Sequence, residues 1–248
     1  MQFIAVIPAR FASTRLPAKL LEKIGSRTVL EHTWRSVEHI EWLDKVIIAT
    51  DHKRIEEEAK RFGANVVMTS VNHQSGSDRI AEVIKNISCD VIINIQADEP
   101  FTSSQDLEIL RDIFTRDSLH EVDVASLMSR IVEEDLIANP NIVKVVTNLQ
   151  QDALYFSRSP IPYKRSDVQV DYYRHIGIYA YRKQSLMRFV SMPPSITEKA
   201  EMLEQLRFLE NSMRIRMGVT QHAAIAIDTA EDLERAREFY QKNSEQNL

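Results

Sequence analysis

The sequence predicts an α/β protein with a doubly wound, mainly parallel sheet and a smaller, partly antiparallel α+β extension. Short apolar runs alternate with helical patterns through the first half of the chain. In the second half, segments of strand composition lie close together and are joined by turns. Strand–crossover–strand units in one sheet are almost always right-handed, so the loops after parallel strands gather at one edge of the sheet. Ligand chemistry is expected at that edge.

The first half supplies the parallel sheet. Runs such as Val46-Ile47-Ile48-Ala49 are continuously apolar, which is typical of strands buried on both faces. The segments between them repeat apolar residues at helical spacing. Predicted strands cover residues 3–7, 45–50, 65–68 and 91–95, and predicted helices cover about 28–41, 53–62 and 78–86.

The second half supplies the extension. Turn signals at Asn139-Pro140-Asn141 and Ser159-Pro160-Ile161-Pro162 flank closely spaced strand candidates. A last helix should begin near Thr229, whose hydroxyl can cap it. Predicted strands cover 142–147, 153–156, 175–181, 214–219 and 223–227, and predicted helices cover about 184–190 and 198–211. Boundaries near 139 and 218 divide the chain into 1–138, 139–217 and a return to the core over 218–248.

Composition excludes several classes of protein. The 248 residues are 44% hydrophobic and 27% charged, as in ordinary soluble domains. A net charge of -5 disfavours a general nucleic-acid binder. Cys89 is the only cysteine, so neither an internal disulfide nor a thiolate metal site is expected. With no apolar stretch long enough for a bilayer and no signal-peptide pattern, a cytoplasmic protein without membrane partners is predicted.

A cationic loop follows the first predicted strand. It contains Arg10, Ser13, Arg15 and Lys19, and no acidic residue occurs among the first 21. Backbone N–H groups of such a loop and its cations can hold phosphates, so a nucleoside triphosphate is the expected ligand. A solvated basic loop is the alternative.

Two acids also follow apolar runs. Asp98 comes after the 91–95 run and Asp228 after the 223–227 run. Mg²⁺ prefers one or two carboxylates plus substrate phosphates, so the two acids together suggest a metal site. Asp98 as a turn acid before Pro100, and Asp228 as an acid at a helix N-terminus, remain the alternatives.

Polar residues in two other regions suit a nucleoside and an acidic sugar. The run from His73 to Arg79 has a glycine before a helix, which allows close backbone approach, although it could be only a capped loop. Arg158 and His175 flank aromatic strand segments and could face a second pocket, while the aromatic residues themselves are typical of core packing. The predicted helix 198–211 has a polar face with Glu201 that could border a site, although such acids are solvated by default.

Common nucleotide and hydrolase motifs are missing from the sequence. It contains no G-x-G-x-x-G, no P-loop, no G-x-S-x-G and no His cluster with metal-ligand spacing. A glycosyltransferase would carry D-x-D where this chain has Gln96-Ala97-Asp98-Glu99.

An ordered series of motifs resembles the CMP-Kdo synthetase family, the 3-deoxy-manno-octulosonate cytidylyltransferases. The series covers nearly the whole chain: Ile7-Pro8-Ala9-Arg10 through Lys19, Ala49-Thr50-Asp51, Val67-Met68-Thr69-Ser70, His73-Gln74-Ser75-Gly76 with Asp78-Arg79, Asn94-Ile95-Gln96-Ala97-Asp98-Glu99-Pro100, Ala153-Leu154-Tyr155-Phe156-Ser157-Arg158, His175-Ile176-Gly177-Ile178-Tyr179, Glu204-Gln205-Leu206-Arg207 and Asp228-Thr229.

This resemblance implies a cytoplasmic, Mg²⁺-dependent, usually homodimeric nucleotidyltransferase with a nucleotide-diphospho-sugar transferase-like fold. It would join CTP and Kdo, the 3-deoxy sugar acid, for lipopolysaccharide or capsule synthesis. Residues 1–138 would bind the nucleotide, and 139–217 would bind the sugar acid and form the dimer. The implied catalytic residues are Lys19, Arg10, Arg15 and Asp98. The implied CTP site is Ala9, Arg10, Ser13, Arg15, Lys19, Met68, Ser77, Arg79 and Gln96. The implied sugar-acid site is Arg158, His175, Tyr179, Glu204 and Gln205, and the implied Mg²⁺ ligands are Asp98 and Asp228.

The chain departs from the family pattern at three alanines. Ala18 and Ala97 stand where the family has glycine, and Ala230 where it has proline. If the backbone at 97 requires a positive φ, Ala97 costs about 1 kcal/mol, whereas alanine is tolerated where the angles are ordinary. These departures leave a modified Kdo, another 3-deoxy sugar acid, or a non-catalytic nucleotide-binding regulator as alternatives.

Overall fold

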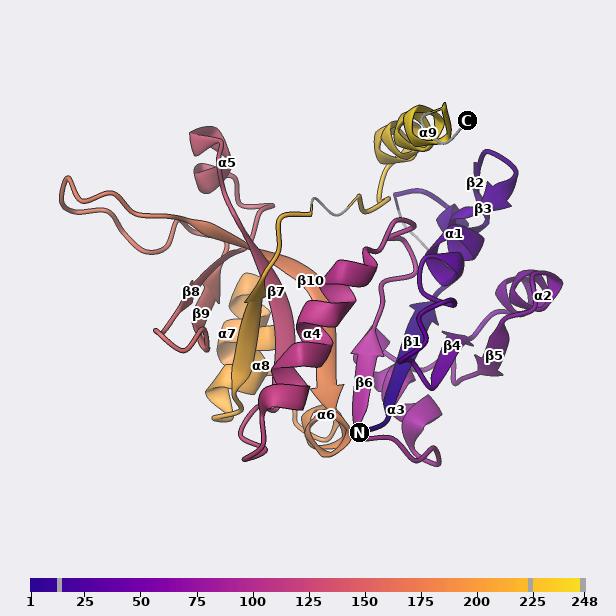
Figure 1. Cartoon of the computed structure of the whole chain (residues 1–248), viewed down its shortest axis with the longest axis horizontal. Coiled ribbons are helices and arrows are strands. Elements are labelled where there is room, and N and C mark those ends of the chain that lie inside the picture. Colours follow the sequence, from indigo (N-terminus) through magenta and orange to yellow (C-terminus); the bar gives the residue numbers. More distant parts are fainter. Residues whose placement is uncertain (13–14, 223–224, 246–248) are drawn as a thin grey trace. The chain divides into compact units, whose positions relative to one another are not determined.

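The computed structural model describes residues 1–12, 15–222 and 225–245, and the chain divides into two compact units. The first unit comprises Met1–Ser104 with Ala223–Leu248, and the second comprises Gln105–His222 (Figure 1). The boundaries between the two units therefore fall after residues 104 and 222. The sequence analysis placed the boundaries near 139 and 218.

The first unit is built on a parallel sheet. Its strands lie in the order β6 (Val91–Asn94), β1 (Phe3–Ala9), β4 (Lys45–Thr50) and β5 (Asn65–Met68), and every neighbouring pair is parallel. Ile7 lies beside Ile48 in the register, and both are fully buried. The predicted parallel sheet is confirmed, because continuous apolar runs suit strands that are covered on both faces.

Helices and a small hairpin complete the first unit. They are η1 (Lys19–Leu21), β2 (Lys23–Ile24), β3 (Arg27–Thr28), α1 (Val29–Arg35), α2 (Lys53–Arg61), α3 (Gly76–Ile84) and α9 (Ala230–Glu245). The side chains of Thr28 and Ser75 cap α1 and α3. The prediction of a strand at 223–227 is wrong over its described part, residues 225–227, which form no strand. Residues 223–224 lie outside the described residues.

The second unit carries the mixed sheet. Its strands lie in the order β11 (Ile215–Val219), β7 (Val124–Arg130), β10 (Tyr173–Arg182), β8 (Lys144–Thr147) and β9 (Ala153–Ser157). The β11–β7 pair is parallel and the other pairs are antiparallel. The partly antiparallel extension is thus confirmed. Residues 104–138, for which no element was assigned, form α4 (Ser104–Arg116), β7 and α5 (Glu134–Ala138), and α6 (Lys183–Val190) follows β10.

The predicted helix at 198–211 is two helices, α7 (Ile196–Glu201) and α8 (Gln205–Glu210). Met202 ends α7 in the left-handed conformation, with φ 55°. A buried ion pair joins the two helices across the break: Arg207 Nη2 lies 2.5 Å from Glu198 Oε1. The periodicity of apolar residues shows which side of a helix is buried, but it does not show where the backbone changes direction.

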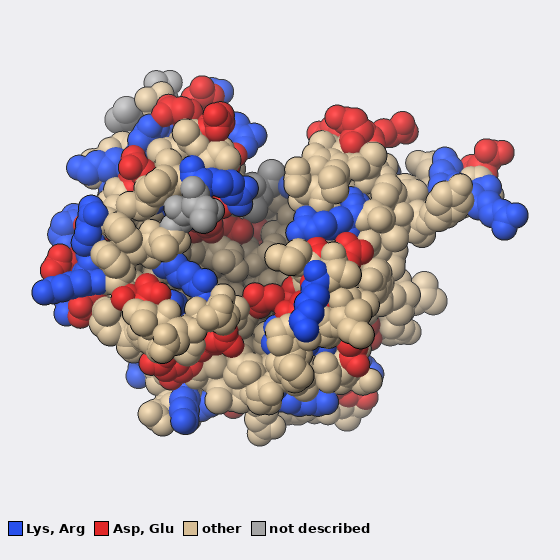
Figure 2. Space-filling view, turned by 180° about the vertical axis from the view of Figure 1, so that it is seen from behind, with Lys and Arg blue, Asp and Glu red and all other residues tan. Residues whose placement is uncertain are grey.

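Charge is mixed over the face of the molecule in Figure 2, where acidic and basic side chains are interspersed and no single basic surface dominates. This mixture agrees with the net charge of -5. Among the described helices, none has the length and apolar character that crossing a bilayer would need.

Candidate active site

Two cations and two carboxylates meet in the first unit. Lys19 Nζ lies 2.5 Å from Asp98 Oδ2 and 2.9 Å from Asp228 Oδ1. Arg15 Nη2 donates to Asp228 Oδ2 at 3.0 Å. The side chain of Lys19 is 13% exposed and that of Asp98 is 24% exposed, so the cluster is open to a ligand and also partly shielded from water. The acids that the sequence placed after two distant apolar runs therefore share one ammonium group.

Backbone hydrogen bonds hold the two acids near each other. Asp98 follows β6, and its carbonyl accepts from Ile227 N at 3.0 Å. Asp228 is thereby placed at the start of α9, where Asp232 accepts from Asp228 N at 3.0 Å and from Thr229 N at 2.9 Å. Capping of this kind satisfies N–H groups that a helix leaves unpaired. The carboxylates therefore project from backbone that is itself tied down.

Lys19 is a permanent cation in this cluster. Burial lowers the pKa of Lys19, but Asp98 first and then Asp228 raise it, and the net result is a pKa above the ordinary value. The charge on Lys19 is retained at neutral pH as a consequence. A positive group of this kind can stabilise negative charge on phosphate oxygens when they replace a carboxylate as its partner.

The donor set suits Mg²⁺. In the described part of the chain, no group of three or more His, Cys, Asp and Glu could hold a metal ion. Asp98 and Asp228 would supply two carboxylates, and Mg²⁺ takes one or two carboxylates while the rest of its shell comes from phosphates and water. The two acids therefore fit a metal that binds together with a phosphorylated substrate.

Two of the three alanine departures, Ala18 and Ala97, differ in backbone conformation. Ala18 has φ 55° and ψ 26°, which is the left-handed region, directly before Lys19. Ala97 does not occur among the described non-glycine residues with positive φ. Its carbonyl accepts from Thr33 Oγ1 of α1 at 2.9 Å. Alanine is therefore strained at position 18 and accommodated at position 97.

Arg79, which the resemblance places near the cytidine, lies beneath the edge of the sheet. It is fully buried, with Nη2 2.5 Å from Asp51 Oδ2, and Nη1 donates to Thr69 Oγ1. Asp51 and Thr69 follow β4 and β5, so the guanidinium joins the ends of two strands. This placement stabilises the loops at the carboxyl edge.

Other predicted CTP residues lie along the same edge. Arg10 Nη2 donates to His73 O at 2.9 Å, which joins the cationic loop to the polar run before α3. A Cβ on Gly76 would lie 3.4 Å from Pro8, so the start of α3 packs against the end of β1. Ala9 and Ser77 are buried, Gln96 is half-buried and Met68 is 45% exposed. Ser13 lies outside the described residues.

In the second unit, His175 sits at a β-bulge of β10. The register with β7 shifts between Ile176 and Tyr179, and Ser126 fills the bulge. Ser126 Oγ lies 2.9 Å from His175 Nε2, and it donates to Ile178 O or Ile176 O. The serine thus ties the imidazole to the bulge through Nε2, and the ring nitrogen Nδ1 is not used in this contact. Burial lowers the pKa of His175 to about 3, so the ring is neutral.

Tyr179 lies near His175, and Glu204 lies close enough to Tyr179 to affect it. The rings of His175 and Tyr179 are 5.3 Å apart. Burial, with smaller effects of Tyr181 and Glu204, raises the pKa of Tyr179 well above its usual value. Glu204 is exposed before the first turn of α8, and Gln205 is buried in that turn. The structure therefore groups a neutral imidazole, a phenol and a carboxylate.

Arg158 is held by backbone carbonyls. Its Nε donates to Glu201 O at 2.7 Å and its Nη1 to Pro140 O at 2.9 Å. In the described part of the chain it forms no ion pair with a carboxylate. The guanidinium is half-buried and oriented, and its charge is available to an anion.

Ser126 and Lys144 were not identified from the sequence. Ser126 is a small polar residue inside an apolar strand, and Lys144 begins a strand. Residues in such positions are common without a functional role, so the sequence indicated a site only weakly. Glu201 was identified only as part of a solvated face. Its carboxylate instead accepts from Ser157 Oγ at 2.6 Å and Arg158 N at 2.9 Å.

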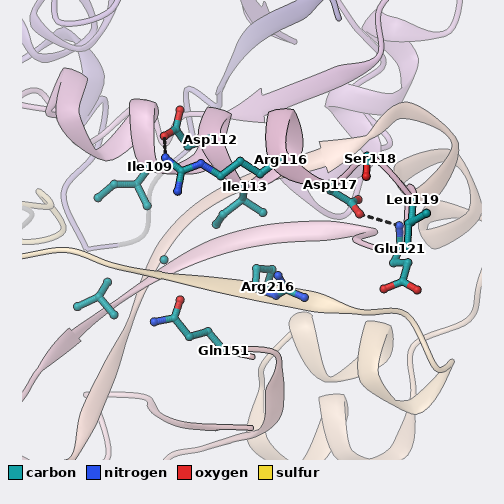
Figure 3. A pocket seen from close by; sticks show the side chains of 12 residues that line it. Ile109, Asp112, Ile113, Arg116, Asp117, Ser118, Leu119, Glu121, Gln151 and Arg216 are labelled. Carbon is teal, nitrogen blue, oxygen red and sulfur yellow. Dashed lines mark hydrogen bonds and ion pairs between the residues drawn. The ribbon is translucent and has the colours of Figure 1, made fainter. Parts of the chain in front are cut away.

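The second unit also has a cavity of about 590 Å³ beside α4 and β11 (Figure 3). No predicted site residue lines it. Its charged side chains are already paired: Arg116 with Asp112, Asp117 with Arg182, and Arg216 with Asp152. The cavity therefore offers no free charge to a ligand.

The chain matches known proteins over nearly its whole length. The family model described as cytidylyltransferase matches residues 4–215. The 3-deoxy-manno-octulosonate cytidylyltransferase of Flavobacterium johnsoniae is 50% identical over 238 residues, 96% of this chain and 98% of the relative. That of Elusimicrobium minutum is 46% identical, covering 97% and 98%. The solved structure of CMP:2-keto-3-deoxy-manno-octonic acid synthetase complexed with CTP superposes with a TM-score of 0.93 at 38% identity, covering 98% of this chain and 100% of that one. The chain belongs to the 3-deoxy-manno-octulosonate cytidylyltransferases, a family of nucleotidyltransferases.

Proposed function

We propose that this protein transfers CMP from CTP to the anomeric hydroxyl of Kdo, releasing pyrophosphate. The observation that carries the proposal is the cluster in which Lys19 lies between Asp98 and Asp228, with Arg15 beside it. Relatives that are 40–50% identical carry the same activity in their names, and the similar solved structure holds CTP.

In this reaction the sugar hydroxyl attacks the α-phosphorus, and the bond from that phosphorus to the pyrophosphate oxygen breaks. The hydroxyl proton passes to solvent. Arg10, Arg15 and Lys19 would neutralise the triphosphate and stabilise charge on the leaving group. Mg²⁺ held by Asp98 and Asp228 would supply further charge neutralisation and lower the pKa of the attacking hydroxyl.

The second unit would hold the sugar acid. The half-buried Arg158, without a carboxylate partner in the described residues, is suited to the sugar carboxylate. Neutral His175 can form a hydrogen bond with a sugar hydroxyl, and the carboxylate of Glu204 can accept hydrogen bonds from others. Such partners suit the many hydroxyl groups of an eight-carbon sugar acid.

The wider setting is also part of the proposal. We infer a cytoplasmic homodimer that supplies the activated sugar for lipopolysaccharide or capsule synthesis. The supply of CTP in the cytoplasm supports this location, because the reaction consumes a nucleoside triphosphate.

Pyrophosphate release tests the reaction directly. Purified protein is mixed with Mg²⁺, each nucleoside triphosphate in turn, and Kdo or another 3-deoxy sugar acid. Release with CTP and Kdo is the expected result. Release only with another sugar acid would keep the reaction and change the substrate. CTP binding without release for any sugar acid would replace the enzyme with a nucleotide-binding regulator.

A further inference from the structure

We propose that Lys144 is a positioning residue that holds Arg158 in the conformation that receives the sugar carboxylate. The inference rests on the proposed function, in which Arg158 binds that carboxylate. Lys144 itself does not contact the substrate in this proposal. It acts through the backbone on which Arg158 is mounted.

Lys144 is fully buried at the start of β8, paired with Ser157 of β9 and Arg174 of β10. Its Nζ donates to three carbonyl oxygens: Asn139 O at 3.0 Å, Ile142 O at 2.7 Å and Arg158 O at 2.5 Å. An ammonium has three N–H bonds, so its donors are all used. One side chain therefore joins the turn at 139–142 to the end of β9.

The same two segments position the guanidinium of Arg158. The turn supplies Pro140 O, which accepts from Nη1 of Arg158 at 2.9 Å. On the opposite side, Glu201 accepts from Arg158 N and from Nε. Because Lys144 binds the carbonyls on either side of Pro140, it sets the distance between the turn and Arg158. Without it, the carbonyl of Pro140 would be free to move away from the guanidinium.

A purely structural role does not require a charge in this position. Burying an ammonium is costly, and an apolar side chain of similar volume often stabilises a core as well. Burial lowers the pKa of Lys144, Glu201 raises it and Arg158 lowers it again. The ammonium of Lys144 and the guanidinium of Arg158 thus lie near one carboxylate, that of Glu201. The excess positive charge favours an anion at Arg158, the half-buried member of the pair.

The proposal predicts where kinetic effects will fall. Loss of Lys144 should weaken binding of Kdo and leave binding of CTP unchanged, since Lys144 contacts only segments of the second unit. A double-mutant cycle measures the coupling between Lys144 and Arg158. If Lys144 acts on Kdo binding only through Arg158, the free-energy effects of the two substitutions do not add.

The experiment compares Lys144→Met, Arg158→Met and the double variant in the pyrophosphate assay. We expect Lys144→Met to raise KM for Kdo at least about tenfold, with KM for CTP within about twofold. In the Arg158→Met background, Lys144→Met should change KM for Kdo less than about twofold. Lys199→Met is the matched control, since Lys199 is exposed on α7, and its KM values should equal those of the unmodified protein.

The outcomes separate the inference from the function. If Arg158→Met raises KM for Kdo but Lys144→Met does not, or if the two effects multiply, the positioning role is overturned and the proposed function stands. If Arg158→Met leaves KM for Kdo unchanged, the role of Arg158 fails and the inference with it. If Lys144→Met does not fold, Lys144→Gln replaces it throughout the cycle, because its shorter amide has two N–H bonds and cannot serve all three carbonyls. A KM for Kdo that stays normal in this folded variant also overturns the inference.

Discussion

The ammonium of Lys19 forms ion pairs with both Asp98 and Asp228, so all three residues contribute charge to one cluster. We expect Lys19→Ala or Asp98→Ala to lower turnover at least about a hundredfold, because each removes charge that stabilises the transition state. The thermal unfolding transition should stay cooperative. Lys85→Ala, at an exposed position at the end of α3, is the control. A folded Lys19→Ala protein with near-normal kcat would remove Lys19 from the catalytic site.

Ala18 and Ala97 allow a matched test of backbone strain. Ala18 is in the left-handed region, so Ala18→Gly should raise the free energy of unfolding by up to about 1 kcal/mol. Ala97 lacks a positive φ, so Ala97→Gly should lower that free energy by about 0.5–1 kcal/mol through the greater entropy of the unfolded chain. Urea denaturation of both variants measures the two changes in the free energy of unfolding. Equal effects at the two positions would contradict the assigned conformations.

His175 makes the stability depend on pH. Its pKa is about 3 in the folded protein, against about 6.5 in an unfolded chain. The unfolded chain therefore takes up the proton first, so the contribution of His175 is complete above about pH 6.5 and is lost as the pH falls toward 3. Between pH 7.5 and pH 5 the free energy of unfolding of the unmodified protein should fall by about 2 kcal/mol more than that of the His175→Gln variant. Parallel losses in the two proteins, measured by urea denaturation, would show that His175 is not buried as a neutral ring.

Among the elements, β11 and α4 meet at a glycine. A Cβ at Gly218 would lie 2.3 Å from Ile109 Cγ2 and 3.0 Å from Leu127 Cδ2, so the helix packs directly on backbone. Gly218→Ala should lower the free energy of unfolding by about 1–3 kcal/mol through overpacking. A Cβ at Gly177 meets no atom within 4 Å, which makes Gly177→Ala the control in the same denaturation experiment. Equal stability of the two variants would contradict this packing.

Element prediction succeeded where periodicity and burial agree. The strands β1, β4 and β6 are mainly apolar and buried, and each was located to within two residues, as was the largely exposed edge strand β5. The break between α7 and α8 was missed because Met202 adopts a left-handed conformation that its residue type does not signal. The run at 225–227 is apolar and forms no strand, since Ile227 N donates to the loop carbonyl of Asp98.

For the whole molecule, we expect a homodimer. Large apolar side chains are exposed in the second unit, among them Tyr163 at 85%, Ile196 at 83% and Leu154 at 60%. All three lie within residues 139–217, the part of the chain that the family resemblance assigns to the dimer, and exposed apolar side chains suit a contact surface. Light scattering should give about twice the monomer mass of 28.6 kDa. A monomer at micromolar concentration would contradict the proposal.

The sequence alone determined the parallel sheet, the cationic loop and the identity of the acids that follow apolar runs. Hydrophobic periodicity and residue chemistry are local properties, and a single sequence displays them. Only the tertiary structure decided that Lys19 joins Asp98 to Asp228, that Ser126 forms a hydrogen bond with His175, and that Lys144 holds the backbone of Arg158. These contacts join residues 14 to 209 positions apart, and their geometry depends on how distant backbone segments pack.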